Sequence, residues 1–465
     1  MRTDYVPHSE GDIRRMLAAI DARSTDDLFF EVPQEVRLSR PLALTAGRSE
    51  SEVAEELSRL AATDTPASSL ASFMGAGVYD HYVPACVDAI VGRSEFTTAY
   101  TPYQPERSQG LLRAIFEFQT LVCELTGLDV ANASMYDGGT ALAEAAFLAT
   151  AETGRSELLV SPAVHPEYRQ VLDTLTAGAG ARTRLTALTD GAATCAAEAA
   201  ALAGPETAAV VIQQPNFFGA FEDVAAFAHL AHSLGALLIV VADPLALGLL
   251  EAPGAFGADI VCGEAQAFGN PMNYGGPGLG FLAASKRLTR RMPGRLVGET
   301  RDIRGRRGYV LTLQTREQHI RRQRATSNIC SNHALNALAT TVYLGWLGRE
   351  GLPELGDLCA KKAAYLRRIL LDIPGVTAFT AGPVFREFTL RLPRPAAEVV
   401  DALVSRGFLA GVPVSRFAGS FGAPASLSTE DLLLVAVTER RTREQMDALA
   451  AALATELADA QVTHG

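Results

Sequence analysis

The chain contains the apolar run Leu237-Leu238-Ile239-Val240-Val241, which is followed by Ala242, Asp243 and Pro244. A short aliphatic run bounded by turn residues is typical of a strand that is buried on both faces. Similar runs occur at residues 158–160, 208–212 and 259–261, with Ala-rich helical stretches between them. Buried strands that alternate with helices predict a mainly parallel sheet covered by helices on both faces. The chain is therefore expected to be an α/β protein.

The length of 465 residues predicts two or three domains, because it exceeds what one simple core accommodates. We expect an N-terminal helical arm (1–72), a large α/β domain (73–335), and a connecting helix with a small α+β C-terminal domain (336–465). Residues 53–60 of the arm have amphipathic helical spacing, and such an arm usually packs on a neighbour or a partner. Strands of the small domain are predicted at 387–392 and 432–437.

Composition limits the classes of function. The net charge of -11 and the pI of about 5.3 argue against a nucleic-acid surface. The N-terminus shows no apolar signal segment and no run is long enough for a membrane span, so we expect a cytoplasmic protein. The six cysteines are scattered without a CxxC or Cys/His cluster, which predicts reduced thiols and no metal site.

Lysine is rare in this chain. Its only lysines are Lys286, in the strongly basic segment 284–324, and Lys361 and Lys362, on a predicted helix. All three placements are typical of solvated surface. We interpret the basic segment as a solvated loop, and the alternative is a surface that attracts an acidic partner protein.

Two motifs lie where an α/β sheet could place a ligand. Gly138-Gly139-Thr140 leads into an Ala-rich helix, and its N–H groups together with the helix dipole could cradle a phosphate. Small residues at this point also allow close helix packing, and the sequence favours neither interpretation. Asp243 ends a buried strand, at the edge where open α/β sheets bind ligands. A lone aspartate in this position more commonly caps the next helix.

The segment Tyr100-Thr101-Pro102-Tyr103-Gln104-Pro105-Glu106 is the most unusual in the chain. Its two prolines fix φ and favour a stiff, extended backbone. The side chains of Tyr100, Thr101, Tyr103 and Gln104 on such a backbone suit a binding surface better than a core.

Several longer motifs resemble one protein family. One is Thr315-Arg316-Glu317-Gln318-His319-Ile320-Arg321-Arg322, and the others are residues 75–82, 99–106, 131–138, 275–280 and 325–330. In this order, from about residue 5 to about residue 455, they resemble the glycine-cleavage P-protein, and more narrowly subunit 1 (alpha) of its split, two-subunit form. The resemblance implies a PLP-dependent transferase-like (fold type I) large domain, a small α+β C-terminal domain and an N-terminal helical arm.

The resemblance also implies a division of labour. The family decarboxylates glycine with pyridoxal phosphate (PLP) and passes the aminomethyl group to the lipoylated H-protein. In the split form the Schiff-base lysine belongs to the beta subunit. At the corresponding turn, after residues 259–261, this chain has Gln266, and an amide cannot form an imine. The resemblance therefore implies no catalytic residue and no bound cofactor in this chain, with PLP on the partner beta subunit.

The remaining implications concern the pocket and the partners. Residues of a vestigial cofactor pocket would be Gly138, Gly139, Thr140, Asp243 and Gln266. The segment with Tyr100, Thr101, Tyr103 and Gln104 would lie at the entrance of the partner's active site. Expected partners are the beta subunit, the lipoylated H-protein and glycine, with no nucleic acid and no membrane. Three alternatives are a subunit of a related amino-acid decarboxylase of secondary metabolism, a stand-alone protein that binds PLP without a covalent bond, and a binding partner of a lipoylated carrier.

Overall fold

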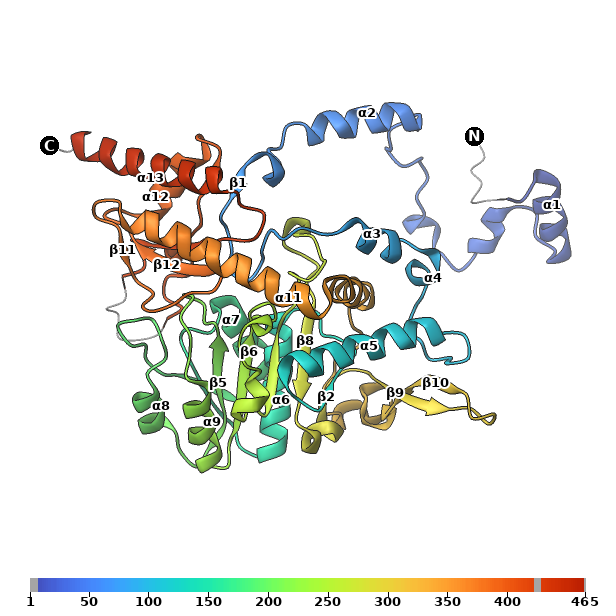
Figure 1. Ribbon diagram of the computed structural model, residues 1–465. Helices are drawn as coiled ribbons and strands as arrows, with labels where there is room; N and C mark the ends of the chain where they lie inside the picture. Colours follow the sequence, from blue (N-terminus) through green and yellow to red (C-terminus); the bar gives the residue numbers. More distant parts are fainter. Residues whose placement is uncertain (1–6, 422–427, 464–465) are drawn as a thin grey trace. The chain divides into compact units, whose positions relative to one another are not determined.

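The computed structural model describes residues 7–421 and 428–463, and Figure 1 traces them along the chain. The chain divides into two compact units, Met1–Thr65 and Pro66–Gly465. The first unit contains helices α1 (Glu10–Ala19) and α2 (Glu50–Ala61), so the helices predicted in the arm are present. The boundaries expected after residues 72 and 335 are a finer division, and they stay predictions.

The first unit has helices with well-specified starts but no core of its own. Ser9 and Ser49 each cap a helix and form a capping box with the acidic residue three positions later. Neither helix buries a residue, and Leu57 in the apolar row of α2 is 60% exposed. Helices of ten and twelve residues are marginal in water by themselves. This arm therefore requires contacts from outside its own unit to hold one structure.

The second unit is built on a seven-stranded sheet with the order β2-β8-β7-β6-β5-β3-β4. The strands are β2 (Val130–Ala131), β3 (Glu157–Val160), β4 (Arg182–Leu185), β5 (Thr207–Gln214), β6 (Leu237–Ala242), β7 (Ile260–Glu264) and β8 (Gly280–Ala284). Neighbouring strands from β4 to β7 run parallel, whereas β8 is antiparallel to both β7 and β2. The prediction of a mainly parallel sheet is confirmed.

Successive residues of the central strands enter two different cores. Leu238 and Val240 pack in a cluster with residues of α5, α9 and α11, whereas Ile239 and Val241 pack in a cluster with residues of α6 and α7. The helices are α5 (Gln109–Thr126), α6 (Gly138–Thr153), α7 (Pro166–Ala177), α8 (Ala196–Leu202), α9 (Val224–Ser233) and α11 (Ala334–Leu371). Burial on both faces explains why these strands are continuously apolar rather than alternating.

The C-terminal part forms a separate four-stranded antiparallel sheet with the order β11-β12-β15-β14. Its elements are β11 (Thr377–Ala378), β12 (Glu387–Arg391), α12 (Ala396–Val404), β13 (Phe408–Leu409), β14 (Val412–Pro413), β15 (Leu432–Ala436) and α13 (Arg443–Thr463). The predicted strands near 387 and 432 are both present. The short strand β1 (Ala71–Ser72) pairs in parallel with β13, and Phe73 is buried in the core of this sheet.

One expectation about local structure is wrong. The basic segment is not a loop, because β9 (Leu296–Arg301) and β10 (Arg307–Thr312) form an antiparallel hairpin. Its apolar residues Val297, Tyr309 and Leu311 pack with residues of α5, and the dense arginines between them conceal this pattern in the sequence. Helix α11 is divided into two helical segments by a break at Gly348, where φ is +65°. Short helices α3 (Ala85–Val91), α4 (Ser94–Thr97) and α10 (Gln318–Arg321) complete the elements.

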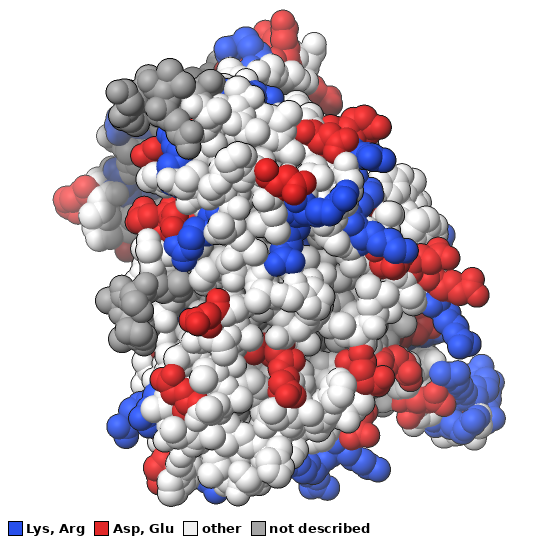
Figure 2. Space-filling model, turned by 60° about the vertical axis from the view of Figure 1, so that its left-hand side comes forward, with Lys and Arg blue, Asp and Glu red and all other residues white. Residues whose placement is uncertain are grey.

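The charged side chains do not segregate by sign on the face drawn in Figure 2, where acidic and basic groups are interspersed among uncharged ones. Charge on this face is therefore balanced locally. In the part of the chain that the structure describes, no helix combines the length and the apolar character that crossing a bilayer requires.

Gly219 lies where the loop after β5 comes very close to strand β12. Gly219 has φ of +89°, and a Cβ placed on it would lie 2.2 Å from the carbonyl oxygen of Glu387. Gly180 has a similar φ of +76°, but a Cβ there would meet nothing within 4 Å. A side chain would therefore meet backbone strain at both positions, but of the two only Gly219 would also bring the added Cβ into overlap with backbone atoms.

We predict that Gly219→Ala lowers the free energy of unfolding by at least about 2 kcal/mol more than Gly180→Ala does. The excess reflects the overlap with β12, because the two variants share the cost of a positive φ. Urea unfolding followed by circular dichroism measures the difference. Equal midpoints for the two variants would show that the loop after β5 adjusts without cost.

Candidate functional site

A cavity of about 410 Å³ lies at the start of α6 and the end of β7, and a smaller one of about 40 Å³ adjoins it. Gly139 and Gln266 line the larger cavity, and Asp243 lines the smaller one. The two cavities share Gly77, His165, Tyr168 and Glu264 as wall residues. Gly139, Asp243 and Gln266 of the predicted pocket thus lie around adjoining cavities, whereas Gly138 and Thr140 line neither cavity.

Gln266 is a structural link to the segment that precedes α3. Its Oε1 accepts a hydrogen bond from the Tyr79 N–H at 3.0 Å, and its Nε2 donates to the Tyr79 carbonyl at 3.2 Å. Nε2 also donates to the carbonyl of Asn270 at 2.7 Å. The side chain is buried, and its amide satisfies the backbone of Tyr79 as a neighbouring strand would. The amide therefore has a role at this position that an ammonium group could not fill, since an ammonium accepts no hydrogen bond.

The first turn of α6 is occupied by acceptors from the chain itself. Glu264 Oε2 accepts from the Gly138 N–H at 3.1 Å, and Asp137 Oδ1 accepts from the Thr140 N–H at 2.8 Å. The other carboxylate oxygen of Glu264 accepts from the N–H groups of Gln266 (2.9 Å) and Leu279 (2.6 Å). Burial raises the pKa of Glu264 to about 7, although these N–H donors oppose the shift.

Asp243, at the end of β6, forms an ion pair with Arg386. The distance from Arg386 Nη2 to Asp243 Oδ2 is 2.8 Å, and the arginine side chain is only 3% exposed. Asp243 Oδ1 also accepts from the Leu245 N–H two residues on, which is a local turn contact and not a cap of the following 3-10 turn η4 (Ala246–Gly248). The Arg386 guanidinium lies over the Tyr79 ring, 3.6 Å from its centroid. Burial opposes the charge on Arg386, but the attraction of Asp243 together with that of Tyr79, Cys359 and Glu387 outweighs it, and the pKa of Arg386 is raised.

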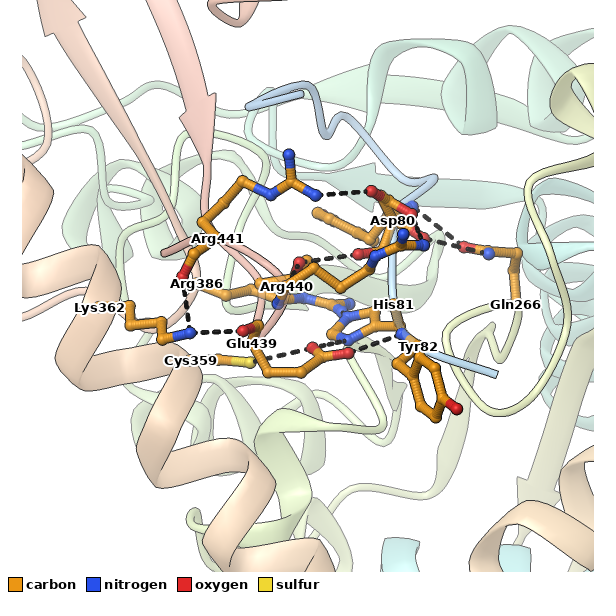
Figure 3. A network of polar contacts seen from close by, with 12 residues as sticks. Asp80, His81, Tyr82, Gln266, Cys359, Lys362, Arg386, Glu439, Arg440 and Arg441 are labelled. Carbon is orange, nitrogen blue, oxygen red and sulfur yellow. Dashed lines mark hydrogen bonds and ion pairs between the residues drawn. The ribbon is translucent and has the colours of Figure 1, made fainter. Parts of the chain in front are cut away.

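The same arginine begins a buried polar network, which Figure 3 shows from close by. Arg386 Nη1 donates to His81 Nε2 at 2.5 Å, so His81 Nδ1 carries the proton that it donates to Glu439 at 2.6 Å. Burial alone would raise the pKa of Glu439, but the hydrogen bonds from His81 and Tyr82 lower it to about 2. The segment before α3 is therefore fixed to the end of the C-terminal sheet by ionic contacts.

Lys362 also belongs to this network, and its expected placement on the solvated surface is wrong. Its Nζ donates to the backbone carbonyls of Glu439 and Arg441. Lys361 is exposed and pairs with Asp357, as expected for a surface residue. Lys286 begins the 3-10 turn η7 (Lys286–Arg291) after β8, and it too is exposed. None of the three lysines lines the two cavities among the described residues.

One cluster of potential metal ligands was missed by sequence spacing. The ligand atoms of His81, Cys359 and Glu439 lie within 4.8 Å of one another, although the three residues are far apart in the chain. Both ring nitrogens of His81 are already engaged, one by Glu439 and the other by the Arg386 guanidinium. A cation at this point would face that guanidinium, so the contacts favour the ionic network over a metal.

The segment predicted to form a binding surface is accessible. Tyr100 is 89% exposed and Tyr103 is 51% exposed. Tyr100 and Thr101 line a cavity of about 280 Å³, which shares Pro277 and His333 with the larger cavity above. Tyr103 and Gln104 are exposed outside that cavity, and the Arg295 guanidinium lies 5.8 Å from the Tyr103 ring centroid.

The residues around the two cavities do not fit PLP. No lysine amine reaches them, and the N–H groups of Gly138 and Thr140 that could hold a phosphate already have carboxylate partners. Asp243, which could pair with a protonated ring nitrogen, is paired with Arg386. No chemical step at a cofactor is therefore derived for this chain.

Two residues of the site, Glu264 and Arg386, escaped the sequence reasoning. Glu264 had a signal, because it follows the predicted strand at 259–261 in the same turn as Gln266. An acidic residue at the carboxyl end of a buried strand points toward the ligand edge of the sheet. Arg386 had no local signal, since its partners Asp243 and His81 come from other parts of the fold.

Comparisons with known proteins agree with this architecture. The model of the glycine cleavage system P-protein family matches residues 3–453. A protein of Moorella thermoacetica described as a probable glycine dehydrogenase (decarboxylating) subunit 1 is 51% identical over 449 residues, which is 97% of this chain and 98% of the relative. A protein of Geobacillus kaustophilus with the same description is 50% identical over 443 residues, 95% of this chain and 97% of the relative.

Solved structures agree as well. A crystal structure of glycine decarboxylase (P-protein) in inhibitor-bound form matches 98% of this chain and 100% of its own, with a TM-score of 0.89 and 49% identity. A glutamate decarboxylase of Lactobacillus brevis matches 91% of this chain and 96% of its own, with a TM-score of 0.69; at 12% identity it shows the fold alone. The fold is that of PLP-dependent transferases of type I, as the sequence predicted. On the strength of these matches and of the architecture they share, the chain belongs to the glycine cleavage system P-protein family.

Proposed function

We propose that this chain is the subunit of a two-subunit glycine dehydrogenase (decarboxylating) that holds no cofactor. A second subunit of the same enzyme would carry PLP, which acts as the electron sink for decarboxylation of glycine. A lipoylated carrier protein would accept the aminomethyl group. The descriptions of the relatives as subunit 1 support a partner subunit. The observation that carries the proposal is Gln266, an amide bonded to the Tyr79 backbone where the cofactor lysine would be required.

Within that enzyme, this chain would shape and shield the partner's active site. The Gln266–Tyr79 link and the ionic network around Arg386 fix the segment before α3. That segment leads to residues 100–104, of which Tyr100, Tyr103 and Gln104 are exposed, and we propose that these residues lie at the entrance of the partner's site. Its role would be to limit the access of water and to position the substrate.

The N-terminal arm supports the existence of a partner. Its helices α1 and α2 have specified starts but bury no residue, and exposed apolar side chains follow one side of α2. A surface of this kind is typical of a subunit that is always assembled. We propose that the second subunit covers the apolar row of α2, which contains Val53, Leu57 and Leu60.

The decisive experiment for the proposed function is reconstitution. We expect this chain alone to release no CO₂ from glycine, and a mixture with the PLP-bearing second subunit to release it in the presence of a lipoylated carrier. Gln266→Lys should not make the single chain active, because Glu264 and the Asp243–Arg386 pair still fill the positions that PLP requires. Borohydride reduction after incubation with PLP, followed by mass spectrometry, detects any covalent adduct at position 266. An active Gln266→Lys chain without a partner would contradict the proposal.

For the arm, we predict that Leu57→Asp weakens association with the second subunit at least about tenfold, because a buried leucine contributes about 1.5–3 kcal/mol. Glu55→Gln is the matched control on the opposite side of α2 and should have no effect. Light scattering and sedimentation velocity measure the association, and circular dichroism checks that the chain is folded. Equal association of both variants would place the arm elsewhere, for example against its own chain or a second copy of it.

At the exposed segment, we predict that Tyr103→Ala lowers kcat of the assembled enzyme about tenfold, which corresponds to about 1.4 kcal/mol. The reason is the loss of a half-exposed ring that Arg295 holds on a stiff backbone. Phe256→Ala, at a half-exposed ring in another loop, should leave kcat unchanged. Unaltered kinetics of Tyr103→Ala in an intact assembly would remove this segment from the entrance.

A further inference from the structure

In the first turn of α6, the N–H groups of Gly138, Thr140 and Ala141 already have acceptors within the chain, and only the N–H of Gly139 has none in the contacts described. Glu264 accepts from Gly138, the Asp137 side chain accepts from Thr140, and the Asp137 carbonyl accepts from Ala141 at 3.0 Å. An unoccupied helix start attracts anions through these groups and the helix dipole. Here a carboxylate that enters from β7 already stands at the helix start and accepts from the Gly138 N–H.

The space beside the start of α6 is large enough for a ligand, although Glu264 occupies the helix start. The cavity of about 410 Å³ begins beside Gly139 and Glu264. On its other side the Tyr168 ring is packed against Gly138, where an added Cβ would lie 2.6 Å from the tyrosine oxygen. A phosphate group could therefore reach the N–H of Gly138 only by displacing the Glu264 carboxylate.

At the far wall of the adjoining smaller cavity, the chain supplies the opposite charge. Arg386 pairs with Asp243 there, and Glu264 lines the same cavity. The cleft thus contains an anion of its own at the helix start and a cation of its own at the strand end. Glu264 occupies the Gly138 N–H that the phosphate of a ligand such as PLP would require. Arg386 occupies the Asp243 carboxylate that the protonated ring of such a ligand would require.

We propose that Glu264 determines the ligand specificity of the cleft: its carboxylate replaces a bound phosphate at the start of α6 and excludes phosphorylated ligands, PLP among them. This inference rests on the proposed function, for which it supplies a physical cause. A phosphate dianion beside Glu264 would meet a like charge in a poorly solvated place, and of the N–H groups in the first turn of α6 it would find only that of Gly139 without an acceptor in the contacts described. Replacing Glu264 by a small residue should therefore expose a phosphate site.

The exclusion depends on the ionisation of Glu264. Burial raises the pKa of this carboxyl to about 7, so it is largely neutral at pH 6 and largely charged at pH 8. Repulsion of an anion should consequently weaken as the pH falls. Other titratable groups on the cavity wall are Tyr136, Asp137, His165, Glu167, Tyr168 and His333. Glu264→Gln removes the charge of Glu264 alone. A pH dependence of anion binding that this variant loses is therefore due to Glu264 and not to those groups.

The test uses the full-length chain without its partner, and isothermal titration at pH 8 with inorganic phosphate, PLP and pyridoxal. We expect Glu264→Ala to bind phosphate at least about tenfold more tightly than the wild type, and to bind PLP more tightly than pyridoxal. Glu167→Ala is the matched control, because Glu167 lines the same cavity but is exposed and accepts no N–H of α6 in the contacts described. It should behave as the wild type does.

A folded Glu264→Ala chain with no gain in phosphate affinity would overturn the proposal. Should that variant fail to fold, sulfate, a dianion at both pH values, is titrated into the wild type at pH 6 and pH 8. Tighter binding at pH 6 that disappears in Glu264→Gln supports the role of Glu264, and binding that is independent of pH contradicts it. Saturable binding of PLP to the wild type at pH 8 would instead contradict the proposed function, so the two failures are distinguishable.

Discussion

The Glu264 carboxylate joins three parts of the large domain at one point. It accepts N–H groups from the start of α6, from the turn after β7 and from the segment before β8. A buried carboxylate is costly unless it has such partners, and these partners are all backbone groups that the fold must bring together. The positions of the cavity walls, of Gln266 and of the first turn of α6 all depend on the meeting of these N–H groups at one carboxylate.

A second buried charge has a comparable role between the two sheets. Arg386 immediately precedes β12 of the C-terminal sheet, yet its guanidinium pairs with Asp243 at the end of β6 and with His81 before α3. A buried ion pair contributes little net stability compared with apolar packing, but leaving one member unpaired is strongly unfavourable. The pair therefore acts mainly on geometry: it allows one arrangement of the two sheets and penalises others.

The sequence predicted those features that depend on local pattern. Strands β5, β6 and β7 were recognisable because burial on both faces leaves an uninterrupted aliphatic run, and Gln266 was recognisable because its turn follows such a run. The hairpin of β9 and β10 was missed because arginines interrupt its apolar residues, and the edge strand β4 because its residues are partly exposed. The partners of Asp243 and of the α6 start could not be predicted, since each comes from a distant part of the chain.

The pairing of β1 with β13 has a consequence for the order in which the protein is made. Phe73 is fully buried in a core whose other members lie between residues 363 and 457. On a ribosome this phenylalanine emerges early, and its neighbours emerge only when synthesis is nearly complete. The C-terminal sheet and its core are therefore the last part of the nascent chain to acquire their structure. They form only when Phe73, which is made early, can meet residues that are made late.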